Sequence, residues 1–292
     1  MKIGFVSILG RPNVGKSTLL NALLSKKVSI VSPKAQTTRD AISGILNEKD
    51  YQIVFVDTPG IFYGKEKLYS LMKKTAFESS RDVNAIIYMV DASTKTLDED
   101  IKIYNSINSD APRIVVLNKI DLIKAQEAKE KKEIISESMK STLLIEASIK
   151  ENFGLKEIKE AIYSYLEEGE PFYPTNMITD KDKAYQAKEI IRGKLLHFLR
   201  QEIPHQCAVV ISSFKENDDK IEISAKIVTE KENQKGIIIG KGGNMIKSIK
   251  AAAKKEMETS WHKNVASLKI EVEADPGWRD SIKKLIEYGY GE

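Results

Sequence analysis

The chain has 292 residues, of which 41% are hydrophobic and 30% are charged, and its net charge is +4. This composition is typical of a soluble protein that buries a core, and the length favours two domains over one. The single cysteine, Cys207, excludes an internal disulfide, and no apolar run reaches the roughly 18–20 residues of a membrane span, so we expect a cytoplasmic protein.

Charge is unevenly distributed along the chain. Residues 231–263 contain eight lysines and three glutamates, a local excess of +5 that is larger than the net charge of the whole protein. Such a cluster favours an acidic partner for the C-terminal part of the chain.

The sequence Gly-Arg-Pro-Asn-Val-Gly-Lys-Ser-Thr at residues 10–18 fits the phosphate-binding pattern G-x-x-x-x-G-K-[ST]. An apolar run at residues 3–9 precedes it and a helical pattern at 19–24 follows it, which is the strand–turn–helix context that a P-loop requires. Lys16 is then expected to reach the β- and γ-phosphates, and Ser17 to ligate Mg²⁺. The remaining nucleotide contacts of this loop are expected from Gly10, Pro12, Asn13, Val14, Gly15 and Thr18. The alternative, a chance glycine turn that holds a lysine, is disfavoured by the motifs further along the chain.

Strands and helices alternate through the rest of the first half. After a polar loop at residues 28–40, which is long enough to move, the runs 42–46 and 51–56 are typical of a strand pair. Further strands are expected at residues 85–90, 114–117 and 143–145. Helices are expected at residues 68–80, 98–107, 124–140 and 155–166. This alternation predicts an α/β domain with a mostly parallel sheet that is covered on both faces.

Two further motifs each follow a predicted strand. Asp57, in Asp-Thr-Pro-Gly, lies at the carboxyl end of a strand, where α/β sheets place ligands, and is expected to serve Mg²⁺. The N–H of Gly60 is expected to face the γ-phosphate. This sequence also suits a plain turn, but it comes 41 residues after the P-loop lysine. Asn118-Lys119-Ile-Asp121 follows a buried strand, and a carboxylate there accepts two hydrogen bonds from guanine that adenine does not offer. The order of the three motifs predicts a guanine-nucleotide site.

The composition changes at residues 169–176, where a proline-rich segment separates two domains. We place the first domain at residues 1–170, a linker at 171–182 and the second domain at 183–292. In the second domain, helices are expected at residues 183–200, 244–258 and 278–288, and strands at 206–214, 220–229 and 266–272. This mixture predicts a small α+β domain.

The second domain contains its own glycine motif, Gly240-Lys241-Gly242-Gly243, between two helical stretches. A tight G-x-x-G turn lets the backbone approach sugar-phosphates closely and clamp about four nucleotides. Lys241 is placed to contact a phosphate. The residues that extend the positive surface are Lys235, Lys247 and Lys250. The alternative is a glycine-rich helix cap beside a solvated lysine face. The apolar residues 237–239 are expected to belong to the core.

The motifs GxPNVGKS, TTR, DTPG and NKxD occur in that order, and together they resemble the translation-factor-related bacterial GTPases. In the second half, Met-Ile-Thr-Asp at 177–180, the helix sequence at 187–196 and Gln-Lys-Gly-Ile-Ile-Ile-Gly-Lys-Gly-Gly at 234–243 narrow the resemblance to the Era family. The resemblance covers essentially the whole chain. It implies a P-loop GTPase domain fused to a type II KH domain that binds RNA.

The Era resemblance implies a GTP-hydrolysing switch in assembly of the small (30S) ribosomal subunit. Its ligands are GTP or GDP with Mg²⁺, and its partner is the 3′ end of 16S rRNA. By matching position, Thr38 meets Mg²⁺ and the γ-phosphate, with Thr37 as the alternative. Asn13 matches an asparagine that holds an activating K⁺ in related GTPases, a role that stays open here. Ile61 stands where many GTPases carry a water-positioning glutamine, so slow intrinsic hydrolysis is expected. The catalytic contacts are expected from Lys16, Thr38 and Gly60.

One departure from the family pattern concerns the base. The usual Ser-Ala pair near guanine appears here as Glu146-Ala147. We therefore expect the backbone N–H of Ala147 to meet guanine O6, with Ser148 as the candidate for the supporting bonds of the missing serine.

Two other hypotheses stay open on the sequence. The first is an RNA-binding module whose nucleotide domain is mainly structural. The second is a GTPase of the same class that acts on tRNA or the large subunit, and the Gly-Lys-Gly-Gly domain argues against it. Retention of every expected phosphate and Mg²⁺ residue favours a switch. We expect a monomer, and peripheral association with the inner membrane is left open.

Overall fold

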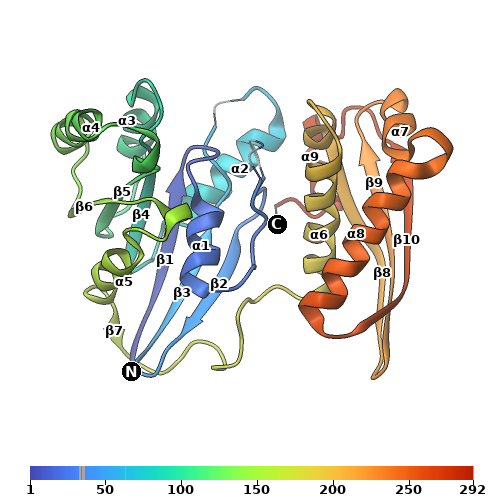
Figure 1. The fold of residues 1–292 in the computed structure, drawn as a ribbon, viewed down its shortest axis with the longest axis horizontal. Coiled ribbons are helices and arrows are strands. Elements are labelled where there is room, and N and C mark those ends of the chain that lie inside the picture. Colours follow the sequence, from blue (N-terminus) through green and yellow to red (C-terminus); the bar gives the residue numbers. More distant parts are fainter. Residues whose placement is uncertain (33, 35–36, 63, 292) are drawn as a thin grey trace. The chain divides into compact units, whose positions relative to one another are not determined.

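The computed structural model describes residues 1–32, 34, 37–62 and 64–291. The chain forms two compact units (Figure 1). The N-terminal unit comprises residues 1–64 and 69–180, and the C-terminal unit comprises residues 65–68 and 181–292.

The N-terminal unit is built on a sheet with the strand order β2-β3-β1-β4-β5-β6, and the short β7 pairs with β1. The strands are β1 (Lys2–Gly10), β2 (Ile42–Asn47), β3 (Tyr51–Asp57), β4 (Ala85–Asp91), β5 (Arg113–Asn118), β6 (Leu143–Glu146) and β7 (Glu167–Glu168). β2 is antiparallel to β3, whereas the pairs from β3 through β6 are parallel. The predicted mostly parallel sheet is therefore confirmed, and the predicted strand pair forms its antiparallel edge.

Helices lie on both faces of this sheet. They are α1 (Lys16–Leu24), α2 (Lys67–Glu78), α3 (Asp98–Asn105), α4 (Ala125–Ser138) and α5 (Leu155–Tyr163). Because side chains of a strand alternate between the two faces, β4 divides its apolar residues between two cores. Ile87 and Met89 pack in the core that α1 and α5 share, and Ile86 and Tyr88 pack in the core that α3 and α4 share. Burial on both faces fixes the carboxyl ends of β1, β3 and β5, where the loops with the sequence motifs begin.

The expected linker at residues 171–182 is held against the N-terminal unit over much of its length. The N–H of Ile45, in the edge strand β2, donates to the carbonyl of Ile178 at 2.7 Å. The Gln52 amide donates to the carbonyl of Tyr173 at 2.8 Å, and the Asn47 amide donates to the carbonyl of Met177 at 2.9 Å. The bond from Ile45 satisfies a backbone group of the edge strand β2 that would otherwise be open to another chain, and the two side-chain bonds hold the linker beside it.

The C-terminal unit packs helices on a three-stranded sheet in which β9 lies between β8 and β10. Its elements are α6 (Lys183–Phe198), β8 (Cys207–Glu216), β9 (Lys220–Thr229), α7 (Glu232–Ile239), α8 (Asn244–Trp261), β10 (Asn264–Ala274) and α9 (Ile282–Glu287). β9 is antiparallel to β8 and parallel to β10. Alternate residues of β9, beginning at Ile221, join one core with side chains of α6, α7 and α8. The order α-β-β-α-α-β is that of the predicted KH domain.

Two local predictions for this unit are wrong. Ile238 is fully buried, but Ile237 and Ile239 are 49% and 39% exposed. These residues form the last turn of α7, and neighbouring residues of a helix point about 100° apart, so the three side chains do not share one environment.

The helix expected over 278–288 is shorter, because Ser281 caps α9 by accepting a hydrogen bond from the Lys284 N–H. None of the helices in the described ranges is long and apolar enough to cross a bilayer.

Candidate nucleotide-binding site

The P-loop connects the end of β1 to the start of α1, and its two glycines permit a close approach of backbone to side chains. Gly10 and Gly15 have φ values of +145° and +109°, a range that L-residues rarely adopt. A Cβ on Gly10 would lie 2.5 Å from the carbonyl oxygen of Met89, and one on Gly15 would lie 2.5 Å from Nδ2 of Asn118. The loop therefore packs against the ends of β4 and β5, and its shape depends on both glycines.

Lys16 begins α1 and is almost fully buried. Its Nζ donates to the carbonyl of Gly10 at 3.1 Å and to the carbonyl of Arg11 at 2.8 Å. Burial lowers the pKa of Lys16 to about 8, although the carboxylates of Asp57 and Asp100 favour its charged form. A polyphosphate bound here would favour the charged ammonium further, because opposite charges stabilise each other most in a buried site.

The groups expected to hold Mg²⁺ meet beside Lys16. The Ser17 hydroxyl donates to Oδ2 of Asp57 at 2.7 Å and lies 2.9 Å from the hydroxyl of Thr38. Thr37 instead donates to the carbonyl of Lys34 at 2.7 Å, so the structure favours Thr38 over Thr37 at the metal position. Hydroxyl and carboxylate oxygens are the ligands that Mg²⁺ prefers, and the set fits that ion.

Asp57 is the charged member of this set. It is fully buried, and its Oδ1 has no hydrogen-bond partner in the part of the chain that the structure describes. Burial raises the pKa of Asp57, and hydrogen bonds from Ser17, Ser29 and Thr38 together with the charge of Lys16 oppose this rise. The Ser29 hydroxyl donates to Asp57 at 2.8 Å, a contact that the sequence analysis missed because no motif marks this serine. An unsatisfied carboxylate oxygen in a buried site supports a cation at this position.

A pocket joins the phosphate and metal groups. Residues of the P-loop, including Pro12, Asn13 and Thr18, line it together with Thr37, Thr38 and Gly60. Gly60 packs so closely on the P-loop that a Cβ there would lie 2.7 Å from Cα of Pro12. The N–H of the following Ile61 donates to the carbonyl of Gly10 at 3.1 Å, and the Ile61 side chain is 1% exposed. Position 61 therefore offers the pocket no polar side chain.

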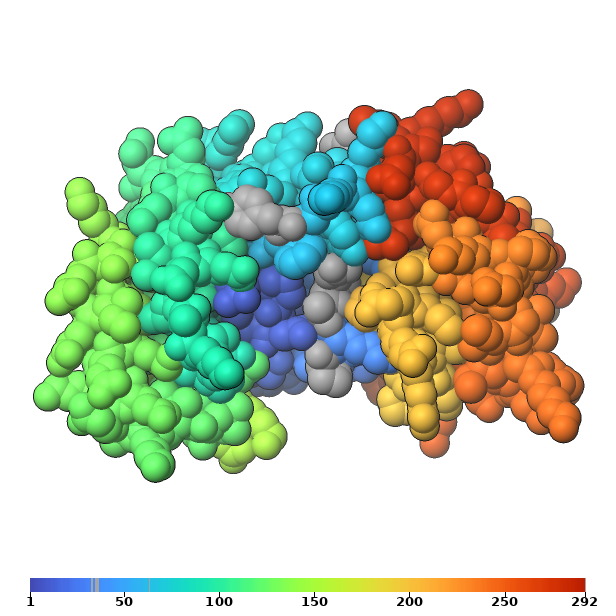
Figure 2. All heavy atoms as spheres, turned by 90° about the horizontal axis from the view of Figure 1, so that it is seen from above, coloured from blue at the N-terminus to red at the C-terminus, as the bar shows by residue number. Residues whose placement is uncertain are grey.

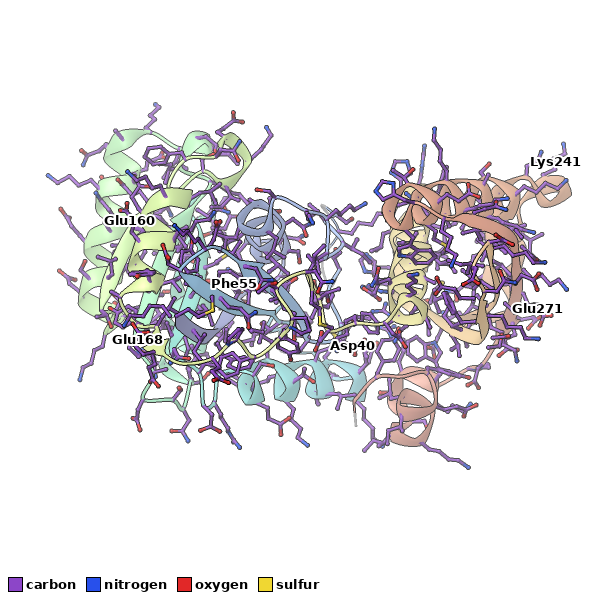
Figure 3. All side chains as sticks on the ribbon, turned by 90° about the horizontal axis from the view of Figure 1, so that it is seen from below. Asp40, Phe55, Glu160, Glu168, Lys241 and Glu271 are labelled. Atoms are coloured by element: carbon purple, nitrogen blue, oxygen red, sulfur yellow. The ribbon has the colours of Figure 1, made fainter. Side chains whose placement is uncertain are left out.

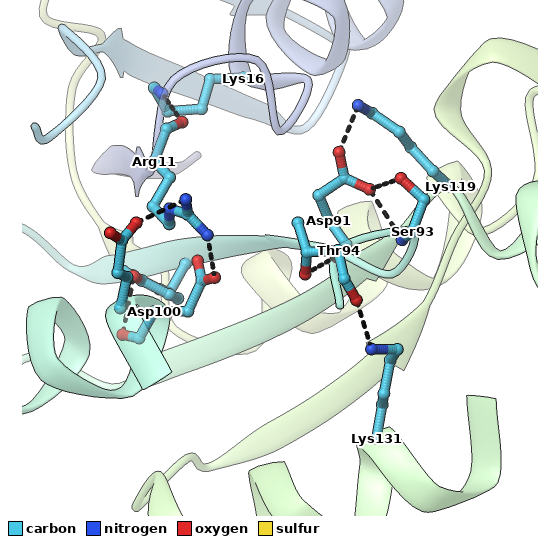
Figure 4. A network of polar contacts seen from close by, with 10 residues as sticks. Arg11, Lys16, Asp91, Ser93, Thr94, Asp100, Lys119 and Lys131 are labelled. Carbon is cyan, nitrogen blue, oxygen red and sulfur yellow. Dashed lines mark hydrogen bonds and ion pairs between the residues drawn. The ribbon is translucent and has the colours of Figure 1, made fainter. Parts of the chain in front are cut away.

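The base-side motif follows β5 and is tied directly to the P-loop. Nδ2 of Asn118 donates to the carbonyl of Val14 at 2.8 Å, and Oδ1 of Asn118 accepts from the N–H of Ile149 at 3.1 Å. Lys119 has a left-handed backbone conformation with φ +65°, and its ammonium pairs with Asp91 at 2.5 Å (Figure 4). These contacts hold the two residues that shortly precede Asp121.

The structure corrects the expected role of Ala147. Its N–H donates to the carbonyl of Leu117 at 2.9 Å, and the residue is fully buried, so this N–H is not directed at a base. Ser148, the next residue, donates its hydroxyl to Oδ1 of Asp121 at 2.5 Å. Glu146 is turned away and pairs with Lys132 at 3.1 Å. The backbone pairing of β6 with β5 thus continues one residue beyond the strand, through Ala147. The serine that supports the Asp121 carboxylate is therefore at position 148 and not at position 146.

The second candidate site is the Gly-Lys-Gly-Gly turn between α7 and α8. Gly240, Gly242 and Gly243 have φ values of +73°, +61° and +76°. Lys241 is exposed and projects from this end of the C-terminal unit (Figure 3). A Cβ on Gly242 would meet no atom within 4 Å, so the backbone there is open to a ligand.

Basic side chains flank this turn on α7 and α8, the segment that Figure 2 draws in orange. Lys247 and Lys250 are exposed on α8. Lys235 of α7 pairs with Glu232 at 2.7 Å, so part of its charge is already compensated. An open glycine turn beside exposed lysines is the arrangement that RNA-binding KH domains use to hold a sugar-phosphate backbone.

The fold and the site together define a class of protein. The P-loop, the converging Ser17, Thr38 and Asp57 oxygens and a base-side carboxylate on one α/β unit are the parts of a P-loop GTPase, and the second unit has the topology of a KH domain. Sequence profiles agree, since a family described as 50S ribosome-binding GTPase matches residues 5–119 and a KH domain family matches residues 202–279.

Comparison with known proteins narrows this class. The chain is 45% identical to GTPase Era of Caldanaerobacter subterraneus over 99% of this chain and 98% of that protein, and 42% identical to GTPase Era of Clostridium acetobutylicum over 99% and 98%. It is similar to the crystal structure of an Aquifex aeolicus Era variant bound to GDP and AlF₄⁻, with a TM-score of 0.94, 38% identity and full coverage of both chains. The chain belongs to the Era family of GTPases. A second structure with the same TM-score, identity and coverage is Era with MgGDPNP and nucleotides 1506–1542 of 16S ribosomal RNA.

We predict that Asp121→Asn changes the base preference of the nucleotide site. The substitution replaces two acceptor oxygens by one acceptor and one donor, which mismatches guanine and suits xanthine. GTP affinity should fall by about 2 kcal/mol or more, the cost of an unpaired polar group in a desolvated site, while xanthosine triphosphate binding should improve. Calorimetric titration with both nucleotides measures the change.

The matched control for this prediction is Glu146→Gln, which neutralises a nearby carboxylate that pairs with Lys132 instead. It should bind GTP like the parent. Unchanged GTP affinity in Asp121→Asn would show that this carboxylate does not read the base.

Proposed function

We propose that the chain is a GTP-driven switch that binds 16S rRNA near its 3′ end and acts in assembly of the small ribosomal subunit. The observation that carries this proposal is the presence, in one chain, of a complete set of phosphate and metal groups and an open Gly-Lys-Gly-Gly turn. A relative with the same fold over its full length has been solved with MgGDPNP and nucleotides 1506–1542 of 16S rRNA, which supports the same ligands here.

In the proposed mechanism, Lys16 contacts the β- and γ-phosphates and compensates the charge that develops on the transferring phosphoryl group. Its ammonium is held in position by two P-loop carbonyls. Ser17, Thr38 and Asp57 would hold Mg²⁺, which neutralises phosphate charge when bound. Gly60 brings its loop against the P-loop, where its N–H can meet the γ-phosphate. Because Ile61 contributes no polar side chain, position 61 does not orient the attacking water, and intrinsic hydrolysis should be slow.

At the base, we propose that Asp121 reads guanine while Asn118 and Lys119 form the walls of the site. Ser148 positions the Asp121 carboxylate through the bond at 2.5 Å.

In the C-terminal unit, we propose RNA contacts from the turn residues Gly240, Lys241, Gly242 and Gly243 and from Lys235 and Lys247. We assign the GTPase domain to residues 1–170, the linker to 171–182 and the KH domain to 183–292.

The competing hypothesis is an RNA-binding module whose nucleotide domain is structural and rarely turns over. The convergence of Ser17, Thr38 and Asp57 beside Lys16 supports turnover, because a purely structural nucleotide site needs no threonine from a separate loop at the metal. We also propose a cytoplasmic monomer, and peripheral association with the inner membrane remains an open expectation.

Removal of the phosphate-side or metal-side group should abolish hydrolysis without unfolding the protein. We predict that Lys16→Ala and Ser17→Ala each lose multiple-turnover phosphate release, because the first removes the compensating cation and the second removes a metal ligand. Phosphate release with and without rRNA measures the effect, and circular dichroism verifies the fold. Lys26→Ala, in the exposed turn after α1, is the control and should turn over normally. Sustained turnover in either P-loop variant contradicts the mechanism.

A potassium role for Asn13 is a separate proposal. Asn13 lines the pocket, and its backbone is left-handed, φ +63°, a conformation that asparagine adopts more readily than most residues. Potassium there would supply a further positive charge at the phosphates. We predict that replacing K⁺ by Na⁺ at constant ionic strength lowers turnover in the parent and has no effect on Asn13→Ala. Equal parental rates in the two salts would remove this role.

RNA binding should depend on the Gly-Lys-Gly-Gly turn. We predict that the double variant Lys241→Asp, Gly242→Asp binds an oligonucleotide copying the 3′ end of 16S rRNA at least tenfold more weakly, about 1.4 kcal/mol. Its salt dependence should be shallower, because fewer cations meet phosphates. The fold should persist, since Asp tolerates a left-handed backbone better than most residues and a Cβ at 242 meets no atom.

The control for this variant changes the net charge by the same amount elsewhere. Lys156→Asp with Ser164→Asp alters exposed positions at the end of the N-terminal unit and should leave RNA affinity close to that of the parent. GTP affinity should be unchanged in both double variants. Full RNA affinity in the folded turn variant would exclude this turn as the contact.

A further inference from the structure

A buried carboxylate behind the P-loop has no role in the mechanism above. Asp100 lies in the first turn of α3 and is fully buried. Its Oδ2 accepts a hydrogen bond from Nη1 of Arg11 at 3.3 Å, and its backbone carbonyl accepts from the Tyr88 hydroxyl at 2.9 Å. Tyr88 belongs to the buried strand β4. Asp100 is therefore anchored to the sheet on one side and holds a P-loop side chain on the other (Figure 4).

Arg11 connects this carboxylate to the phosphate-binding lysine. Its side chain reaches Asp100, while its own backbone carbonyl accepts a hydrogen bond from Nζ of Lys16 at 2.8 Å. A displacement of the Arg11 backbone would move one of the two carbonyls that orient the Lys16 ammonium. Positions of catalytic groups within about 0.5 Å decide whether such a group works.

Two acids contact Arg11, and they are not equivalent. Glu99 pairs with it at 2.5 Å but is 66% exposed, so water and salt screen the pair. Asp100 is fully buried, so its attraction to Arg11 is screened much less. Oδ1 of Asp100 is also buried and has no partner among the described residues. The one hydrogen bond from Arg11 to Oδ2 is long, at 3.3 Å, and Oδ1 can accept a second one. A small shift of the Arg11 side chain would therefore give the two-bond geometry that guanidinium and carboxylate prefer.

We propose that Asp100 is a positioning residue for GTP hydrolysis, which holds Arg11 and thereby the backbone carbonyl that orients Lys16. This inference rests on the proposed role of Lys16. Asp100 lies on α3, a helix that contains none of the sequence motifs. Its proposed role is to keep the P-loop in the conformation that hydrolysis needs.

The charges around Asp100 determine when it is ionised. Burial raises the pKa of Asp100 to about 6, Arg11 on the P-loop lowers it, and Asp91 on β4 and Glu99 on the same helix raise it. Lys16 also faces this carboxylate. Since the folded pKa lies above the ordinary value of 3.8, the folded state binds the proton more tightly than the unfolded chain. This group therefore adds stability as the pH falls from about 6 towards 4, and the ionised carboxylate is a cost to the fold at pH 7.

At pH 7 the ionised Asp100 carboxylate destabilises the fold, whereas its proposed effect on hydrolysis is favourable. A variant without the charge can therefore distinguish a positioning role from a structural one. Asp100→Asn keeps the shape of the side chain and an acceptor oxygen but removes the charge that attracts Arg11. We predict that its kcat for GTP falls at least tenfold at pH 7.5, while its affinity for GDP stays within threefold of the parent. The melting temperature should be equal to or higher than that of the parent, because a buried charge has been removed. A purely structural residue would show the opposite pattern, with lower stability and unaltered chemistry.

The pH profile gives a second readout. The ratio of the parental kcat to that of Asp100→Asn cancels titrations that both proteins share, such as that of the γ-phosphate. This ratio should be at least ten at pH 7.5 and should fall about three- to fourfold by pH 5.5, where a pKa of about 6 leaves most of the parental Asp100 protonated. A ratio that does not change with pH contradicts the proposal.

A double-mutant cycle tests whether Asp100 acts through Arg11. Arg11→Met should lose kcat to the same extent as Asp100→Asn, and the double variant should be no slower than either single one. Glu99→Gln removes the exposed partner of the same arginine and should keep kcat within twofold of the parent. The inference is overturned if the losses of kcat in the two single variants multiply in the double variant. It is also overturned if the kcat of Asp100→Asn lies within twofold of that of the parent.

Failure of the inference and failure of the proposed function give different results. If Lys16→Ala retains turnover, the P-loop mechanism is wrong whatever Asp100 does. If Lys16→Ala is inactive and Asp100→Asn turns over normally, only the positioning role of Asp100 is wrong.

Discussion

One buried amide, that of Asn118, joins the parts of the nucleotide site. It donates to the P-loop at Val14 and accepts from the N–H of Ile149, so a single planar group connects the phosphate loop, the base motif and the loop after β6. The contact is possible only because Gly15 has no Cβ, which would lie 2.5 Å from this amide. The fold itself therefore holds the P-loop and the base-side motif at a fixed distance from each other. Less ordering of these two segments then remains to be done when a nucleotide binds.

Charge is the second constraint on the site, because Lys16, Asp57 and Asp100 are all buried within one small region. Burial shifts each pKa towards the neutral form, and nearby opposite charges, Lys16 beside Asp57 and Arg11 beside Asp100, only partly offset this shift. A fold that keeps such groups in place favours ligands that supply the missing charges, which in the proposed mechanism are phosphate oxygens beside Lys16 and a divalent cation beside Asp57.

Much of this arrangement could be predicted from sequence, since the fold follows from alternating strands and helices and the phosphate groups from a motif with fixed spacing. The errors occurred where tertiary contacts decide the outcome. The role of Ala147 depends on how far the pairing of β6 with β5 continues, which spacing does not reveal. Ile237 and Ile239 were assigned to the core from hydrophobicity alone, although a helix exposes part of any apolar run.

Contacts made by single residues were the hardest to predict. Ser29 and Asp100 carry no motif, and their roles arise because α1 and α3 bring distant segments beside Asp57 and Arg11. The linker illustrates the same limit. Its proline-rich composition indicates a linker, but the hydrogen bond from Ile45 that holds it to the N-terminal unit depends on β2 lying at the edge of the sheet.

The loop at residues 28–40 shows how the site can be rigid and still respond to its ligand. Its start is clamped, because Oδ1 of Asn21 on α1 accepts from the N–H groups of Val28 and Ser29 and the Asn21 amide donates to the carbonyl of Ser29. Its end continues into β2, which the sheet holds. Between these two anchors, Thr38 contacts the site through the hydroxyl of Ser17 and, at 3.5 Å, through Asp57. Those same oxygens are the proposed metal ligands, so the position of Thr38 depends directly on the charge at the metal and the γ-phosphate. In the proposed mechanism, loss of the γ-phosphate would therefore act on the loop through Thr38, while the contacts of Asn21 and the pairing of β2 stay in place.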